Sequence, residues 1–314
     1  RLDSQLKFLL EADKLRLVER ANLVLDCSRR ENSAEHSWHL ALYALVLTPL
    51  AAPHVEASRV IKMLLLHDLV EIDVGDHPIN LATDWEAVAE AEQIAAKRIF
   101  GLLPNDQEAE MLALWQEFEA NQSADARFAK QLDRCQPVFQ TLYGENPVPE
   151  HLEIATETLN GGRASSLETE FPEAFAHAQE LLGHPSTTHS SELTSRLPFL
   201  NESDSLKHVL RATLLADGSR REDSAEHSWH IMLYGWILGE YACSDIDISR
   251  VINMLLLHDI VEIDAGDTPI HGAQSPEAQA AQEAQEQQAA DRLFGLLPEQ
   301  QAVTFRALWD EFEA

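Results

Sequence analysis

Cysteine is scarce in this sequence, which has three among its 314 residues. Cys27, Cys135 and Cys243 lie far apart and form no CxxC pair. A disulfide framework or a zinc site built from thiolates needs paired or closely spaced cysteines, so this spacing argues against both. The fold and any ligand site are therefore expected to depend on other residue types.

Basic residues are also few, with 23 Lys and Arg against 53 Asp and Glu and a formal net charge of −30. Nucleic acid polymers and anionic membrane surfaces repel such a chain, so we expect neither as a partner. A small phosphorylated substrate is compatible with this charge, because a metal ion and one or two local arginines are enough to hold it.

Long apolar runs are missing. The most apolar stretch, residues 40–53, contains a threonine and two prolines, whereas a membrane-spanning helix needs about 20 apolar residues in succession. The chain opens at Arg1 with a polar segment and no apolar signal region, which predicts a cytoplasmic protein. Its first residue is not Met, so we expect that the chain is trimmed.

Glycine is sparse, with 12 residues, and no segment alternates steadily between apolar and polar residues. Ala, Leu, Glu and Gln dominate, and these residues favour helices. Ser33 and Ser123 are expected as helix N-caps. The sequence predicts an all-α helical bundle. The expected helices cover residues 4–25, 33–50, 55–71, 84–101, 105–120, 123–143 and 167–182.

The chain contains an internal repeat. SAEHSWH occurs at 33–39 and again at 224–230, and RVIKMLLLHDLVEIDVGD at 59–76 returns as RVINMLLLHDIVEIDAGD at 250–267. LWQEFEA at 114–120 matches LWDEFEA at the end of the chain. Such self-similarity predicts two tandem copies of one domain. We assign copy one to residues 1–183, a Ser- and Thr-rich linker to 184–197, and copy two to 198–314.

Ionisable residues interrupt the apolar helices of copy one. His67 and Asp68 follow an apolar run, His36 has a similarly apolar setting, and Asp133 lies in the segment AKQLDRCQP. Two imidazoles and two carboxylates suit Mn²⁺, Fe²⁺, Co²⁺, Zn²⁺ or Mg²⁺. The alternatives are a buried hydrogen-bonded His–Asp pair and, for Asp133, a surface ion pair with Arg134 or Arg127. The sequence alone leaves the choice of metal open.

The order H…HD…D, together with SAEHSWH, HDLVEIDVGD, LWQEFEA and LDRCQP, resembles the HD superfamily of metal-dependent phosphohydrolases. The resemblance is to the branch of the bacterial 5′-deoxynucleotidases and the HD-domain-containing-2-like proteins, and it covers residues 14–137 and the matching part of copy two. It implies a helical bundle with a divalent metal ion held by His36, His67, Asp68 and Asp133. It also implies hydrolysis of a phosphomonoester, above all of a nucleoside 5′-monophosphate.

Two further carboxylates are candidates for catalysis. Glu71 follows His67 by four residues, which places both on one face of a helix and Glu71 near a metal-bound water. The resemblance supports Glu71 as an acid/base or water-orienting group, and the alternative is a solvated carboxylate at a helix end. Asp76 follows Gly75, where the resemblance implies contact with the sugar or assistance to catalysis. Its alternative is an Asx turn before His77.

Arg20, on the first predicted helix, is the candidate for phosphate binding. The resemblance implies an arginine in this neighbourhood that contacts phosphate. The related nucleotidases follow it with a tryptophan that helps to discriminate the sugar, whereas Ala21 stands here. This departure leaves the preference for deoxyribose open.

Copy two keeps most of the same residues. His227, His258 and Asp259 match the metal ligands, and Glu262 and Asp267 match the two catalytic candidates. The repeat offset puts the counterpart of the last Asp beyond the end of the chain. We expect a fragment of a longer protein. The alternative is a copy that binds metal weakly and serves in dimerisation or regulation, and the resemblance suggests a homodimer or a pseudo-dimer within one chain.

Other functions and roles stay open. The chain is alternatively an HD phosphodiesterase, or a nucleotide-binding or assembly protein with a degenerate second domain. A di-iron oxygenase is the remote alternative, because it needs additional histidines where copy one offers only His77. Three tryptophans, Trp38, Trp115 and Trp309, are expected to anchor the core, and His39 is expected to be packed and hydrogen-bonded.

Overall fold

The computed structural model describes residues 1–77, 83–185, 188, 190–243, 245–268 and 275–314. The chain divides into two compact units, residues 1–194 and 195–314, which are described separately. The segment predicted as a linker, 184–197, contains the short helix α11 (Ser191–Thr194), and its residues 186, 187 and 189 lie outside the described part. None of the described helices combines the length and apolarity needed to cross a bilayer.

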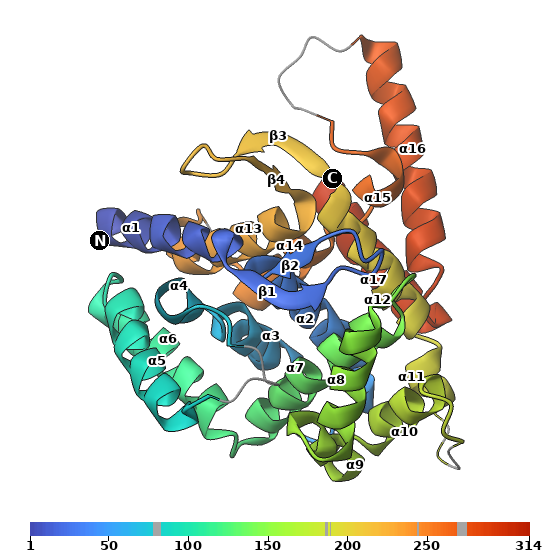
Figure 1. Cartoon of the computed structure of the whole chain (residues 1–314). Coiled ribbons are helices and arrows are strands. Elements are labelled where there is room, and N and C mark those ends of the chain that lie inside the picture. Colours follow the sequence, from blue (N-terminus) through green and yellow to red (C-terminus); the bar gives the residue numbers. More distant parts are fainter. Residues whose placement is uncertain (78–82, 186–187, 189, 244, 269–274) are drawn as a thin grey trace. The chain divides into compact units, whose positions relative to one another are not determined.

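Helices dominate both units, which confirms the all-α prediction (Figure 1). A two-stranded antiparallel hairpin accompanies the helices in each unit. In unit 1 the elements are α1 (Leu2–Ala12), η1 (Asp13–Leu17), β1 (Glu19–Leu23), β2 (Arg30–Asn32), α2 (Ser33–Leu47), η2 (Thr48–Leu50), α3 (Ala57–Leu66), α4 (Glu71–Val74), α5 (Trp85–Phe100), α6 (Asn105–Ala120), α7 (Ala124–Leu142), α8 (Pro149–Asn160), η3 (Arg163–Ser166), α9 (Leu167–Glu170), α10 (Pro172–Leu181) and α11.

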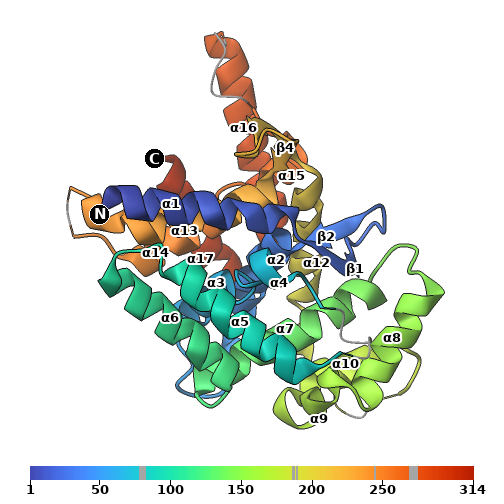
Figure 2. The same ribbon diagram turned by 60° about the vertical axis from the view of Figure 1, so that its left-hand side comes forward.

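Helix α2 is the centre of unit 1 and packs on α3 and α7 (Figures 1 and 2). All of its residues except Leu45 are buried, among them Trp38, which confirms that tryptophan as a core anchor. The N-cap lies one residue earlier than expected. Asn32, and not Ser33, occupies it, because the Asn32 side chain accepts from the backbone of Ala34 and Glu35 while Glu35 reaches back in a capping box.

The first predicted helix is wrong beyond Ala12. The chain continues through η1 into β1, which pairs with β2 in the register Glu19↔Asn32 and Leu23↔Arg30. Arg20 therefore lies on a strand and not on a helix. The pairing joins residues across a turn, and helix propensity read along the chain does not report it.

The predicted helix 55–71 is interrupted after His67. In a continuous helix the carbonyl of His67 would accept from the amide of Glu71. Here the indole of the buried Trp115 donates to that carbonyl at 3.1 Å, and the Glu71 amide donates to Asp68 instead. Glu71 thus starts the separate helix α4, so His67 and Glu71 do not share one helical face as expected.

Two corrections concern the end of unit 1. Helix α8 was not expected, and the predicted helix 167–182 is divided into α9 and α10 at Phe171. Proline disfavours helical geometry in the residue before it, and Pro172 follows Phe171 directly.

Unit 2 repeats the element order of the first part of unit 1. Trp309 is buried in it and donates to the carbonyl of His258 at 3.2 Å, as Trp115 does to His67. The elements are α12 (Leu197–Ser203), η4 (Asp204–His208), β3 (Leu210–Leu214), β4 (Arg221–Asp223), α13 (Ser224–Leu238), η5 (Gly239–Tyr241), α14 (Ile248–Leu257), α15 (Glu262–Ala265), α16 (Pro276–Phe294) and α17 (Glu299–Glu313).

Candidate functional site

Two histidines and two aspartates from separate elements of unit 1 lie together. His36 comes from α2, His67 and Asp68 from the end of α3, and Asp133 from α7. His36, His67 and Asp133 each offer a ligand atom within 4.8 Å of the others. Nε2 of His36 is 3.4 Å and Nε2 of His67 is 3.8 Å from Oδ1 of Asp133, while Oδ1 of Asp68 is 3.1 Å from Nε2 of His67. The predicted ligand set is therefore compact.

The local structure aims His67 at these carboxylates. Its Nδ1 lies 2.8 Å from the carbonyl oxygen of Leu64, which can only accept, so Nδ1 carries a proton. Nε2 then faces oxygens of Asp68 and Asp133. In the neutral ring, Nε2 carries a lone pair that points at negatively charged oxygens. Only a proton or a cation bound to Nε2 relieves the repulsion between the lone pair and these oxygens. The donor set thus fits a cation at this position.

The pKa values of His67, Asp68 and Asp133 reflect this arrangement. Burial alone would lower the pKa of His67, but the neighbouring Asp68 and Asp133 raise it. Burial alone would raise the pKa of each aspartate. The hydrogen bond from His36 and the charge of His67 lower that of Asp133, and His67 with Arg20 lowers that of Asp68. Negative carboxylates thus face the imidazole of His67, where a divalent cation can take the place of the proton.

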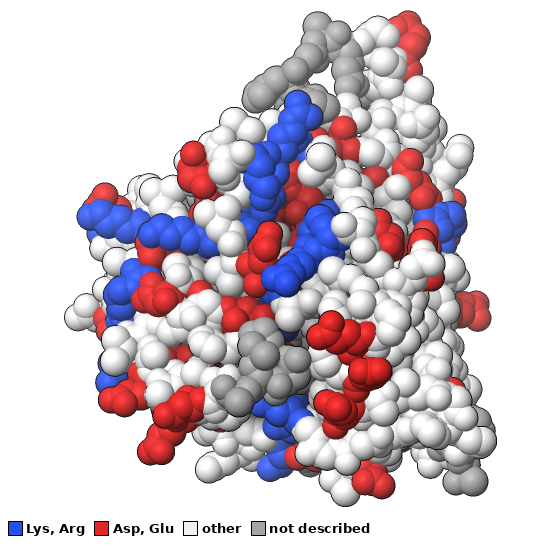
Figure 3. Space-filling model, viewed as in Figure 1, with Lys and Arg blue, Asp and Glu red and all other residues white. Residues whose placement is uncertain are grey.

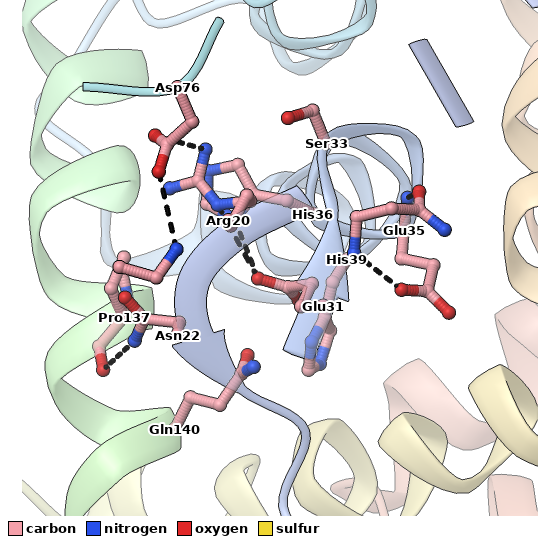
Figure 4. A network of polar contacts seen from close by, with 12 residues as sticks. Arg20, Asn22, Glu31, Ser33, Glu35, His36, His39, Asp76, Pro137 and Gln140 are labelled. Carbon is pink, nitrogen blue, oxygen red and sulfur yellow. Dashed lines mark hydrogen bonds and ion pairs between the residues drawn. The ribbon is translucent and has the colours of Figure 1, made fainter. Parts of the chain in front are cut away.

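Arg20, on β1, lies among several carboxylates, of which Figure 4 shows Asp76 and Glu31. Its Nη1 lies 3.0 Å from Oδ2 of Asp68, 3.8 Å from Oδ1 of Asp76 and 4.0 Å from Oε1 of Glu71. Burial alone would lower the pKa of this guanidinium, but the carboxylates hold it above its ordinary value. Asp68 therefore presents one oxygen to His67 and the other to Arg20.

Glu71 and Asp76 border the same space. Ser33 donates its hydroxyl to Oε2 of Glu71 at 2.6 Å. Burial and the charge of Asp68 raise the pKa of Glu71 well above its ordinary value, so this carboxyl tends to keep a proton. Gly75 adopts a φ of +75°, which favours glycine. Asp76, the next residue, accepts from the backbone amide of Ala21 at 3.2 Å.

The structure also tests the alternative role considered for Asp133 and the role expected for His39. Arg134 pairs with Glu170 at 3.0 Å, and Arg127 donates to the carbonyl of Gln122, so among the described residues Asp133 pairs with neither arginine. His39 is buried and lies 3.3 Å from Nε2 of Gln136, which confirms that it is packed and hydrogen-bonded.

A pocket of about 320 Å³ opens on this cluster. Arg20, His67, Asp68, Glu71, Asp76 and Asp133 all line it, whereas His36 lies behind them. Trp85, Lys130 and Arg163 also line the pocket and were not expected from the sequence. The sequence could have indicated Lys130, because it precedes Asp133 by three residues and so lies on the same face of α7. No pattern in the sequence indicated Trp85 or Arg163, since their proximity to the pocket depends on how α5 and η3 pack.

The pocket wall contains charged residues of both signs. Lys130 pairs with Glu119 at 2.8 Å within the pocket wall. On the face of the molecule in Figure 3, Lys and Arg side chains lie interspersed with Asp and Glu. Positive charge near the metal-binding cluster is therefore local, as a small anionic ligand requires.

Unit 2 has a similar but not identical cluster. His227, His258 and Asp259 offer ligand atoms within 4.8 Å of one another. Oδ1 of Asp259 is 3.0 Å from Nε2 of His258, and Oδ2 is 2.8 Å from Nη1 of Arg211. Glu262 lies 3.3 Å from the same guanidinium. Burial and the charge of Asp259 raise the pKa of Glu262 to about 8.

Asp267 completes the resemblance between the two clusters. Its Oδ1 lies 3.7 Å from Nη1 of Arg211, much as Asp76 approaches Arg20. The geometry of the arginine with its carboxylates is thus repeated in unit 2. The carboxylate from α7 has no counterpart among the described residues of unit 2.

Comparison with known families gives a match over most of the chain. The family model of the HD domain matches residues 12–175 and 203–314. Both matched regions include an HD dipeptide, at His67-Asp68 and at His258-Asp259.

Individual relatives are similar to part of the chain. The 5′-deoxynucleotidase HDDC2 of Homo sapiens is 33% identical over 138 residues, which is 44% of this chain and 66% of that protein. The Bos taurus protein of the same name is 33% identical over 136 residues, 43% of this chain and 65% of that protein. The match thus spans slightly less than two thirds of the length of these relatives.

A solved structure is also similar. The crystal structure of a predicted metal-dependent phosphohydrolase from Magnetospirillum magnetotacticum MS-1 is 43% identical, with a TM-score of 0.50. The likeness covers 58% of this chain and 91% of that one.

Proposed function

The chain belongs to the HD domain family, and from this premise we propose that it is a divalent-metal-dependent phosphohydrolase acting on nucleoside 5′-monophosphates. One observation carries the proposal. Nε2 of His67, whose other nitrogen donates to Leu64, faces the carboxylates of Asp68 and Asp133 inside a pocket of substrate size. The names of the similar proteins support both the reaction class and the nucleotide substrate.

We assign the metal to His36, His67, Asp68 and Asp133. A bound divalent ion supplies a water of lowered pKa and neutralises charge on the phosphoryl oxygens. The residues themselves fit the ion, because they combine two neutral nitrogen donors with two carboxylates. Asp68 also fixes Arg20 beside the ion through its second oxygen.

Glu71 is assigned the proton transfer. Its Oε2 accepts from Ser33, which leaves Oε1 to hold or release a proton. The raised pKa of this carboxyl, caused by its burial and by the charge of Asp68, suits a group that both holds and releases a proton. Protonated Glu71 can donate to the leaving oxygen, and its anion can accept a proton from the attacking water.

Arg20 is assigned to the phosphate and Asp76 to the sugar. The guanidinium of Arg20 has carboxylates of Asp68, Glu71 and Asp76 around it. A phosphate oxygen near the ion would add a further, stronger anionic partner to this guanidinium. Asp76 is held against β1 by the amide of Ala21, at a position from which it can accept from a hydroxyl. Ala21 leaves the choice between ribose and deoxyribose open.

The size of the pocket supports a small substrate. A volume of about 320 Å³ lies at the lower end of ordinary ligand pockets. A nucleoside monophosphate fits this range. The proposal concerns unit 1, because this pocket and the carboxylate from α7 belong to that unit.

A phosphate-release assay tests the proposal. Nucleoside mono-, di- and triphosphates and cyclic nucleotides are each offered with Mn²⁺, Co²⁺ or Mg²⁺. We expect turnover of 5′-monophosphates by the wild type and a loss of more than about 100-fold in Asp68→Ala. Glu110→Gln, which changes an exposed acid of α6, is the matched control and should retain activity. Undiminished turnover in Asp68→Ala refutes the assignment.

A further inference from the structure

The wall of the pocket also contains apolar side chains from three helices. They are Val88 and Ala89 of α5, Val138 of α7, and Ile154 and Ala155 of α8. The residues that line the pocket are 85, 88, 89 and 92 on α5 and 151, 154, 155 and 158 on α8. They recur once per helical turn, so one face of each helix borders the cavity. Apolar side chains of α5, α7 and α8 thus share the pocket wall with polar and charged residues, among them Glu92 of α5.

An aromatic ring and a guanidinium lie together in this pocket wall. Cζ of Arg163, the first residue of η3, lies 4.4 Å from the centre of the Trp85 ring. Trp85 is the first residue of α5 and is 36% exposed although it is large and apolar. Among the described residues, Arg163 has no carboxylate within ion-pair distance. The stacked pair therefore presents flat, polarizable surface to the pocket, and no direct ion pair holds the guanidinium elsewhere.

We propose that Trp85 and Arg163 form a stacking subsite for the nucleobase of the substrate. This inference rests on the proposed function, since it assumes a ligand whose phosphate end lies at Arg20. A nucleobase is planar and aromatic, so it stacks on an indole and on a guanidinium plane. Its apolar faces suit the side chains of Val88 and Ile154, while the phosphate of the same ligand suits Arg20, which lines the same pocket.

Stacking also specifies how selective the subsite is. Every base has an aromatic face, so recognition by stacking tolerates different bases and depends on the area of the ring system. We therefore expect purine nucleotides to bind more tightly than pyrimidine nucleotides by a modest factor, with no strict choice of one base.

The subsite belongs to unit 1. Helix α16, which follows the repeated motif in unit 2 as α5 does in unit 1, begins with Pro276 and not with an aromatic residue. Arg163 belongs to η3 of unit 1.

Calorimetry with a matched pair of ligands tests the inference. The chain of 314 residues is titrated in EDTA, which prevents metal-dependent turnover. The two ligands are 2′-deoxyadenosine 5′-monophosphate and 2-deoxyribose 5-phosphate, which lacks the base. We expect the nucleotide to bind about 10-fold more tightly, because stacking of one base contributes on the order of 1–3 kcal/mol. Trp85→Leu should reduce the ratio of the two affinities to about twofold or less and leave the affinity for the sugar phosphate unchanged.

Two further variants complete the experiment. Arg163→Gln should reduce the ratio of the two affinities by about threefold. The effect is smaller than in Trp85→Leu because the indole remains available for stacking. Ile94→Ala, on the same helix but 65% exposed and not part of the pocket wall, should keep the wild-type difference. Equal binding of the two ligands by the wild type, or an unchanged difference in Trp85→Leu, overturns the inference.

The same proteins distinguish this inference from the proposed function. With Mn²⁺ or Co²⁺ added, phosphate release from both ligands is measured. If neither is hydrolysed but the binding difference depends on Trp85, the subsite stands and the hydrolase proposal fails. If both are hydrolysed equally well and Trp85→Leu changes neither KM, the hydrolase proposal stands and the subsite is wrong.

Discussion

Oε2 of Glu31 lies 3.6 Å from Nδ1 of His36, on the side of the ring opposite to Asp133. The same oxygen is 3.6 Å from Nε of Arg20, so one buried carboxylate stands between a candidate metal ligand and the candidate phosphate-binding arginine (Figure 4). Unit 2 repeats this relationship, with Oε1 of Glu222 3.1 Å from Nδ1 of His227 and 3.7 Å from Nε of Arg211. A carboxylate behind a histidine favours the tautomer whose other nitrogen can bind a metal.

Glu31→Gln should therefore weaken metal binding. Loss of such a partner typically lowers metal affinity by about 10- to 100-fold, and titration with Co²⁺ followed by its visible absorption measures this change. Glu110→Gln is again the control, since it removes an exposed acid in α6. An unaltered dissociation constant in Glu31→Gln would show that Glu31 does not orient His36.

Arg20→Met should destabilise unit 1 as well as weaken phosphate binding. It leaves the carboxylates of Asp68, Glu71 and Asp76 in a largely buried cluster without their shared cation. Breaking a buried ion pair costs on the order of 3–5 kcal/mol, which urea denaturation of the metal-free protein can detect. Arg30→Met changes an exposed arginine of the paired strand β2 and should cost little. Equal stability of the two variants contradicts the role given to Arg20.

Trp115→Phe should destabilise the turn that presents His67. The substitution removes the donor to the His67 carbonyl, and an unsatisfied buried carbonyl costs about 1–3 kcal/mol. The freed carbonyl can instead accept from the amide of Glu71 and extend α3, which would shift the metal ligand Asp68 in this turn and lower metal affinity. Trp38→Phe is the control, because the Trp38 indole nitrogen is buried without a hydrogen-bond partner among the described residues. Similar losses of stability and metal affinity in both variants would argue against this role.

Divalent metal should raise the thermal stability of the chain. A ligand present at 100 times its dissociation constant stabilises the native state by about 2.7 kcal/mol. Asp133→Asn should remove most of the shift in Tm that unit 1 contributes, while any contribution from His227, His258 and Asp259 persists. Asp106→Asn, which alters an exposed ion pair with Arg1, should keep the full shift. The prediction is wrong if Asp133→Asn responds to Co²⁺ as the wild type does.

The sequence was informative wherever the signal was local or repeated. The helices at 105–120 and 123–143 were predicted within a residue or two, and Ser123 is the N-cap of α7. The HD dipeptides, the SAEHSWH motifs and Asp133 indicated which side chains belong together, and the structure brings those of unit 1 into one cluster. Such signals are short-range, because a cap or a helical period involves residues a few positions apart.

Only the tertiary structure decided the rest. Arg20 lies on a strand because residues 30–32 pair with it, and Glu71 starts a new helix because Trp115 occupies the carbonyl of His67. Trp85 and Arg163 meet through the packing of distant segments. Each of these relationships joins residues far apart in the chain, and their energy comes from burial and hydrogen bonding that no local pattern of residues encodes.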